Sequence, residues 1–192
     1  AADVSGKAPL VVVHPGASAP SRRYPAASYA VAMDIVIERI GGAVLFTGNA
    51  QEVDLVEGIR AAMAHASSSF AGRLGVAELG ALLERAALLI ANNTGPVHIA
   101  AALGTPVVDL YALTNPQHTP WQVRSEVLYA DVPCRFCYKS VCPTGHQACL
   151  ARVEPAAVAA AAERLLRDAA PARLPARPGA VADPLALHAT AS

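Results

Sequence analysis

The chain has 192 residues, of which 54% are hydrophobic and 16% are charged. Fifteen basic residues balance fifteen acidic ones, and no basic run could follow a nucleic-acid backbone, so we expect no nucleic-acid partner. The length allows one well-buried domain, the alanine-, valine- and leucine-rich composition excludes a disordered chain, and no apolar run reaches the roughly 18 residues of a membrane span.

The first third of the chain predicts two strand–helix units. Residues 10–13 form an apolar run typical of a buried parallel strand, and a helix is expected from Pro25 to about Arg39, where two glycines would end it. A second strand is expected over 43–47. The helix that follows, over 50–63, begins with acidic residues, as the helix dipole favours.

Strands and helices continue to alternate after a serine-rich stretch at 67–69. Further helices are expected over 76–85, after residue 95 and over 155–168, and further strands over 88–91, 107–111 and 126–129. Repeated units of this length predict an α/β fold with a doubly wound, mostly parallel, Rossmann-like sheet. Its ligand site should lie at the carboxyl ends of the strands.

Composition divides the chain into three parts. We expect a polar lead at 1–9, one domain over 10–170, and a tail rich in proline and alanine over 171–192. A cysteine-rich excursion, 134–149, interrupts the domain before its last helix.

The most informative junction lies where the strand over 88–91 meets a polar turn and a helix. Gly95 allows a ligand to approach the backbone, Pro96 suits a first helical turn, and the helix directs its N–H groups at whatever sits over the turn. His98 lies one turn into that helix. The alternative is a plain turn capped by Asn92 or Asn93, with His98 facing the core.

The loop after the first strand also has the composition of a phosphate site. It carries Gly16, the hydroxyls of Ser18 and Ser21, and the paired cations Arg22 and Arg23. As an alternative, the two arginines are solvated surface charges. In a doubly wound sheet this loop opens on the same edge as the Asn93 turn, which indicates a diphosphate or a nucleotide.

A third turn, Thr47-Gly48-Asn49, precedes Glu52 at the same edge. The Glu52 carboxylate could accept hydrogen bonds from ribose hydroxyls, or it could only complement the helix dipole. The sequence contains neither G-x-x-x-x-G-K-[ST] nor G-x-G-x-x-G, which argues against a P-loop enzyme and an ordinary dehydrogenase.

Residues 114–121 follow a strand directly and end in Trp121. One interpretation is that they line a sugar pocket or the cleft between two lobes. The alternative is a proline-rich surface loop with Trp121 packed on the sheet.

Four cysteines have the spacing C-x2-C-x4-C-x6-C, with His146 among them. They are Cys134, Cys137, Cys142 and Cys149. Three interpretations stay open: a structural zinc site, disulfides formed on oxidation, or free thiols.

Three ordered motifs resemble glycosyltransferase family 9, the ADP-heptose:lipopolysaccharide heptosyltransferases. They are His14-Pro15-Gly16-Ala17-Ser18 with Arg22-Arg23-Tyr24-Pro25, the run from Asn92-Asn93-Thr94-Gly95-Pro96 to Val108, and the cysteine-rich run from Pro133 to Leu150. The resemblance covers residues 10–166 and corresponds to the C-terminal, donor-binding lobe of a two-lobed GT-B fold. It implies that the acceptor-binding N-terminal lobe, with the general base, is a partner outside this chain.

The resemblance also implies roles for single residues. Ser18 and Arg22 would contact the donor diphosphate, Glu52 the adenosine ribose, and Thr94, Gly95 and His98 the phosphate and sugar. The full expected donor-binding set is Gly16, Ser18, Arg22, Thr47, Gly48, Glu52, Asn93, Thr94, Gly95, Pro96 and His98. Family members commonly carry Asp where this chain has Asn93, which accepts hydrogen bonds but has no charge.

The implied reaction is transfer of a heptose or related sugar, with inversion, from an ADP-sugar to a lipopolysaccharide core acceptor. Arg22, Arg23 and the helix N-terminus would stabilise the leaving diphosphate, with no cofactor required and no catalytic residue in this chain. The expected location is the cytoplasm, including its inner-membrane surface. A non-catalytic nucleotide- or phosphate-binding module and a zinc-stabilised interaction domain are the alternatives.

Overall fold

The computed structural model describes residues 8–115 and 117–167. The expected tail over 171–192 and most of the expected lead over 1–9 lie outside this part. None of the described helices is both long enough and apolar enough to cross a membrane.

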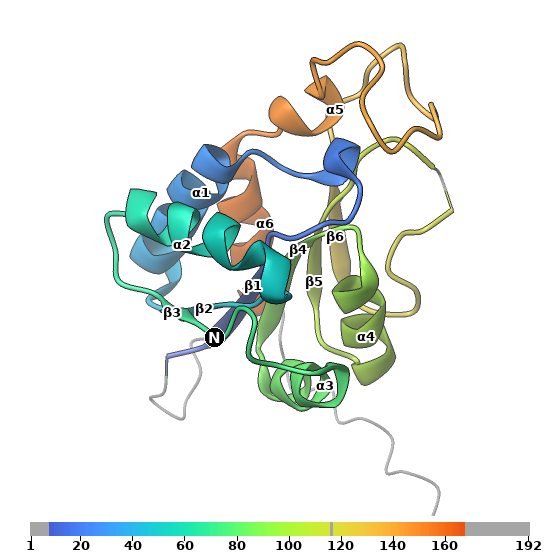
Figure 1. Cartoon of the computed structure of the whole chain (residues 1–192). Coiled ribbons are helices and arrows are strands. Elements are labelled where there is room, and N and C mark those ends of the chain that lie inside the picture. The colour runs from blue at the N-terminus through green and yellow to red at the C-terminus, as the bar shows by residue number, and fades with distance from the viewer. Residues whose placement is uncertain (1–7, 116, 168–192) are drawn as a thin grey trace, which may run out of the picture.

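A six-stranded sheet with the order β3-β2-β1-β4-β5-β6 forms the centre of the domain, and each pair of neighbouring strands is parallel (Figure 1). The strands are β1 (Leu10–His14), β2 (Ala43–Phe46), β3 (Ser68–Ser69), β4 (Leu88–Asn92), β5 (Val107–Leu110) and β6 (Ser125–Leu128). The order reverses between β1 and β4, as in a doubly wound Rossmann-like fold. The predicted fold class is confirmed.

Helices cover both faces of this sheet (Figure 1). They are α1 (Ala26–Ile40), α2 (Val53–Ala62), α3 (Val76–Arg85), α4 (Gly95–Leu103), α5 (Ala148–Ala151) and α6 (Pro155–Arg167). Two 3-10 turns precede α1 and α2, namely η1 (Pro20–Arg22) and η2 (Ala50–Glu52). Gly41 ends α1 with a φ of 66°, the left-handed conformation that glycine adopts without strain.

Two apolar layers pack on opposite faces of the sheet because strand side chains alternate. Val11 and Val13 of β1 belong to a layer with α1, α2 and α6, whereas Val12 belongs to a layer with α3 and α4. β1 and β4 are buried on both faces, which explains their continuous apolar sequences.

Two local predictions differ from the structure. The expected helix over 50–63 is divided into η2 and α2, because Asn49 and Glu52 form a capping box that closes a separate first turn. The serine-rich stretch contains β3, a two-residue edge strand paired with β2 that was not predicted.

Candidate functional site

Asn92 connects the ends of β1 and β4 across the point where the strand order reverses. This fully buried side chain donates from Nδ2 to the Pro15 carbonyl (2.6 Å) and accepts at Oδ1 from the Tyr24 backbone N–H (3.0 Å). The loop between β1 and α1 is therefore fixed against the end of β4. The capping alternative is wrong, because the residue at the N-cap of α4 is Thr94, and it makes no side-chain cap bond.

The two arginines of that loop have different environments. Arg22 is half-buried and lines a cleft, whereas Arg23 is exposed and donates from Nε to the Ala17 carbonyl at 2.9 Å. Ser18 is exposed. Arg22 is thus the cation that faces the cleft, and Arg23 braces the loop.

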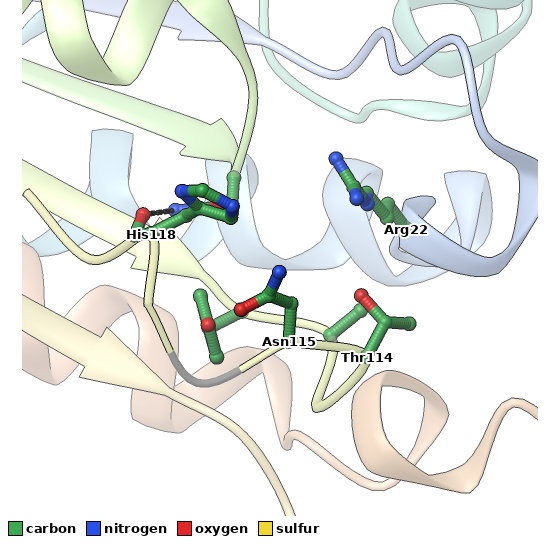
Figure 2. Close-up of a pocket in the computed structure, with 7 residues that line it drawn as sticks. Arg22, Thr114, Asn115 and His118 are labelled. Carbon is green, nitrogen blue, oxygen red and sulfur yellow. Dashed lines mark hydrogen bonds between the residues drawn. The ribbon is translucent and has the colours of Figure 1, made fainter. Parts of the chain in front are cut away.

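A shallow cleft lies beside Arg22, and Figure 2 shows its labelled residues around a common space. Its lining includes Arg22, Asn93, Tyr111, Thr114, Asn115 and His118. Part of the segment over 114–121 therefore lines a pocket, as one of its interpretations predicted. The alternative in which Trp121 packs on the sheet is wrong, because this residue is 75% exposed.

Glu52 is the centre of a second group at the ends of β1 and β2. Its Oε2 accepts from the Asn49 backbone N–H at 2.8 Å and lies 3.7 Å from His14 Nε2, and the residue is only 7% exposed. Gly16 lies against this carboxyl group, which a Cβ at position 16 would overlap. Glu52 therefore has a structural role, because its carboxylate completes the capping box that closes η2.

His14 and Thr47 complete this group. The Thr47 hydroxyl is buried within hydrogen-bond distance of His14 Nδ1 (3.0 Å) and of the Val13 carbonyl (3.3 Å), so its bonds are made inside the protein. Burial lowers the pKa of His14 because the imidazolium loses hydration, although the Glu52 carboxylate acts in the opposite direction. Gly48 also lies against Glu52.

The first turn of α4 faces open space. A Cβ built on Gly95 would meet no atom within 4 Å, and Pro96 occupies the first turn, as predicted. His98 is exposed, so the alternative in which it faces the core is wrong. The N-terminus of α4 is therefore accessible to a ligand.

Asp109 is a site residue that our sequence analysis missed. This fully buried carboxylate on β5 accepts at Oδ2 from Asn93 Nδ2 at 2.8 Å. Burial raises its pKa to about 7, against the opposing effect of the Asn93 hydrogen bond. A charged residue in the apolar run Val107–Leu110 was the available signal, because charged side chains are rarely buried without a partner.

The cysteine-rich excursion braces the Arg22 loop (Figure 1, the orange segment above η1). The Ser21 backbone N–H donates to the Ser140 carbonyl at 3.0 Å, and its hydroxyl donates to the Lys139 carbonyl at 2.7 Å. These contacts fix the turn that carries Arg22.

All four cysteines are free, and together with His146 they line one pocket. Cys134 Sγ lies 3.9 Å from His146 Nε2, but nowhere in 8–115 and 117–167 are three potential metal ligands gathered closely enough to hold an ion. A hydrogen bond from Thr144 lowers the pKa of Cys142, and burial raises that of Cys149. Zinc binding by these residues therefore stays one untested alternative.

The structure thus arranges the predicted residues in two groups at one edge of the sheet. Arg22 and Asn93 share a cleft over β4 and β5, and Gly16, Gly48 and Glu52 lie together over β1 and β2. Such an arrangement offers an arginine and an open helix N-terminus to an anion, and buried carboxylate and amide oxygens to hydroxyl groups.

The model of glycosyltransferase family 9 (heptosyltransferase) matches residues 1–148. Lipooligosaccharide heptosyltransferase 2 of Haemophilus influenzae is 33% identical over 120 residues, which are 60% of this chain and 34% of that protein. The solved structure of a family 9 glycosyl transferase from Veillonella parvula superimposes with a TM-score of 0.74 at 28% identity, covering 83% of this chain and 46% of that one. For E. coli ADP-heptose lps heptosyltransferase II the TM-score is 0.70 at 26% identity, with 85% and 48% covered.

The chain spans about a third of the length of the H. influenzae protein and about half of either solved structure. The family match extends over most of the chain and includes the loops that carry Arg22, Glu52 and Asn93. The chain therefore belongs to glycosyltransferase family 9, the heptosyltransferase family.

Proposed function

We propose that this chain is the donor-binding lobe of a glycosyltransferase that moves a heptose from ADP-heptose to a lipopolysaccharide core acceptor. The observation that carries the proposal is the convergence of Arg22 and Asn93, from the loops after β1 and β4, on one cleft at the carboxyl edge. In doubly wound folds this reversal of strand order is where ligands bind.

The diphosphate would lie between Arg22 and the N-terminus of α4. A guanidinium offers paired N–H donors that match phosphate oxygens, and the helix dipole adds positive potential at Gly95. Both features favour the negative charge that builds up on the leaving group. They would therefore lower the barrier to breaking the sugar–phosphate bond.

The adenosine would lie over the Glu52 group. Glu52 Oε2 already accepts from the Asn49 N–H, which leaves Oε1 to accept from ribose hydroxyls. The Gly16 backbone lies against the same carboxyl group, so the nucleoside would rest on a surface without a protruding side chain at that position.

The sugar would extend into the cleft, where Asn93 offers a neutral oxygen acceptor beside the loop over 114–118. Thr94 and the exposed His98 lie on the neighbouring turn of α4. In the proposed reaction an acceptor hydroxyl attacks the anomeric carbon from the face opposite the diphosphate. The new glycosidic bond forms as the bond to ADP breaks, with inversion.

The acceptor-binding site and the general base would come from a second lobe, because solved relatives are about twice as long as the part that this chain matches. Since a lipopolysaccharide core is attached to a lipid, the reaction would take place at the cytoplasmic face of the inner membrane. The chain alone should bind the donor without transferring its sugar.

Calorimetric titration with ADP, ADP-heptose, UDP and UDP-glucose tests the proposal. We expect binding of both adenine compounds, tighter binding of ADP-heptose than of ADP, and much weaker binding of both uridine compounds. A preference for UDP would refute the adenine assignment, and the absence of binding by all four would refute the donor-lobe assignment for this chain.

A further inference from the structure

Asp109 has no role in the proposed chemistry, although it is a costly group to bury. It is fully buried on β5, and Oδ2 is its hydrogen-bonded oxygen. Within the described residues its Oδ1 has no hydrogen-bond partner, and neither do the hydroxyls of Tyr29 and Tyr111. A buried carboxylate with an unpaired oxygen reduces stability, so packing alone does not explain an acidic residue at this position.

The partner of Asp109 is the Asn93 side chain, which is itself only 6% exposed. Asn93 Nδ2 donates one hydrogen to Asp109 Oδ2 at 2.8 Å and the other to the His118 carbonyl at 2.6 Å. The His118 carbonyl can only accept, so a flipped amide would place its oxygen against that carbonyl oxygen. The amide therefore has one orientation, in which both N–H groups are used inside the protein.

This orientation leaves Asn93 Oδ1 for the cleft that Asn93 shares with Arg22 and Thr114. No described residue donates a hydrogen bond to that oxygen. A sugar hydroxyl is the matching ligand group, because it can donate to a neutral oxygen without bringing a charge into the site. Unlike a freely rotating amide, an oxygen held in this way needs no reorganisation when the sugar binds.

We infer that Asp109 is a positioning residue: together with the His118 carbonyl it holds Asn93 so that Oδ1 accepts a hydrogen bond from a hydroxyl of the donor sugar. The inference rests on the proposed function, because it assumes that the sugar occupies this cleft. It makes Asp109 a determinant of sugar binding and not of nucleotide binding.

A double-mutant cycle tests this coupling in the full chain. We measure by calorimetry the ratio of the dissociation constants for ADP and ADP-heptose, which isolates the contribution of the sugar. Asn93→Ala and Asp109→Ala should each reduce that ratio about five- to tenfold, the effect of one lost hydrogen bond, and leave the dissociation constant for ADP unchanged. Asn93→Ala/Asp109→Ala should show no further reduction, because Asp109 acts only through Asn93.

Asp109→Asn provides the conservative control. Its amide oxygen can still accept from Asn93 Nδ2, so the ratio should stay within about twofold of the wild type. An unchanged ratio for Asp109→Ala would overturn the inference, and so would additive losses in the double variant. Thermal unfolding and the ADP titration show whether each variant is folded.

The two proposals can fail separately. If the wild type binds ADP but gains nothing from the heptose, the inference about Asp109 is wrong and the nucleotide site stands. If the wild type binds neither compound, the proposed function fails, and the inference fails with it.

Discussion

Gly16 lies so close to the carboxyl group of Glu52 that any side chain at position 16 would overlap it. Gly95 presents the opposite case, because a Cβ there would meet no protein atom within 4 Å. A side chain at position 16 would displace the Glu52 carboxyl group, whereas the surrounding protein leaves room for one at position 95. The same substitution at the two positions should therefore have different consequences.

Gly16→Ala should lower the free energy of unfolding by about 1–3 kcal/mol, the usual effect of overpacking a filled site. Gly95→Ala should leave the free energy of unfolding unchanged or slightly higher, because alanine favours helices. It should weaken ADP binding about tenfold, because the added methyl group would lie where we place the diphosphate. Urea unfolding and calorimetry measure the two effects. If Gly95→Ala bound ADP with full affinity, the diphosphate would not lie at this turn.

Arg22→Ala should weaken ADP binding about 10- to 100-fold, the usual range for a lost hydrogen bond to a charged group. Adenosine binding should not change, because the affected contact is with phosphate. Arg23→Ala is the matched control, since its Nε is bonded to the Ala17 carbonyl outside the cleft, and it should have a much smaller effect. Equal losses for ADP and adenosine in Arg22→Ala would contradict the assignment.

The stability of the wild type should depend on pH through Asp109. Its pKa is raised from 3.8 to about 7, so the folded state retains a proton that the unfolded chain releases between about pH 4 and 7. The contribution of Asp109 to the free energy of unfolding therefore falls as pH rises through this window and is constant above it.

Asp109→Asn removes this titration, so its stability relative to the wild type should rise steadily between about pH 4 and 7. The neighbouring Tyr29 and Tyr111 have raised pKa values and remain uncharged there, and His14 is common to both proteins. Urea unfolding at several pH values measures the difference. Parallel stability curves for the two proteins would show that Asp109 does not titrate in this range.

Asn92→Ala should reduce the free energy of unfolding by about 2–4 kcal/mol, because the Pro15 carbonyl and the Tyr24 N–H lose their buried partner. ADP binding should weaken as well, since the loop that these bonds fix carries Arg22. Asn115→Ala is the control, because among the described residues that side chain makes one hydrogen bond, an exposed one accepted from the Gln117 N–H. Similar stability losses in the two variants would contradict the bracing role of Asn92.

The sheet was predictable because its main strands are buried on both faces and therefore form continuous apolar runs, such as that of β4. β3 could not be recognised in the same way, because two serines at the sheet edge carry no apolar pattern. The sequence also could not show that Asn92 does not cap a helix. Its polar atoms bond to the loop after β1 and not to the adjacent helix, and this depends on the tertiary structure.

The positions of Arg22, Gly95 and Asn93 at one edge followed from the topology of parallel strands. The different roles of Arg22 and Arg23 did not follow from the sequence. The two arginines are adjacent in the chain and differ in what their side chains contact. The role of Asp109 depends on a pairing between neighbouring strands that becomes visible only when Asn93 and Asp109 are placed together.

A sugar linked to a nucleoside diphosphate should bind at the carboxyl edge of this sheet. Titration of the 15N-labelled chain with ADP-heptose, followed by amide chemical shifts, measures where it binds. We predict saturable shifts at Ser18, Arg22, Gly48, Gly95 and Asn93, and none at the amino-terminal ends of the strands. Shifts confined to that opposite edge or to the cysteine-rich excursion would contradict the account.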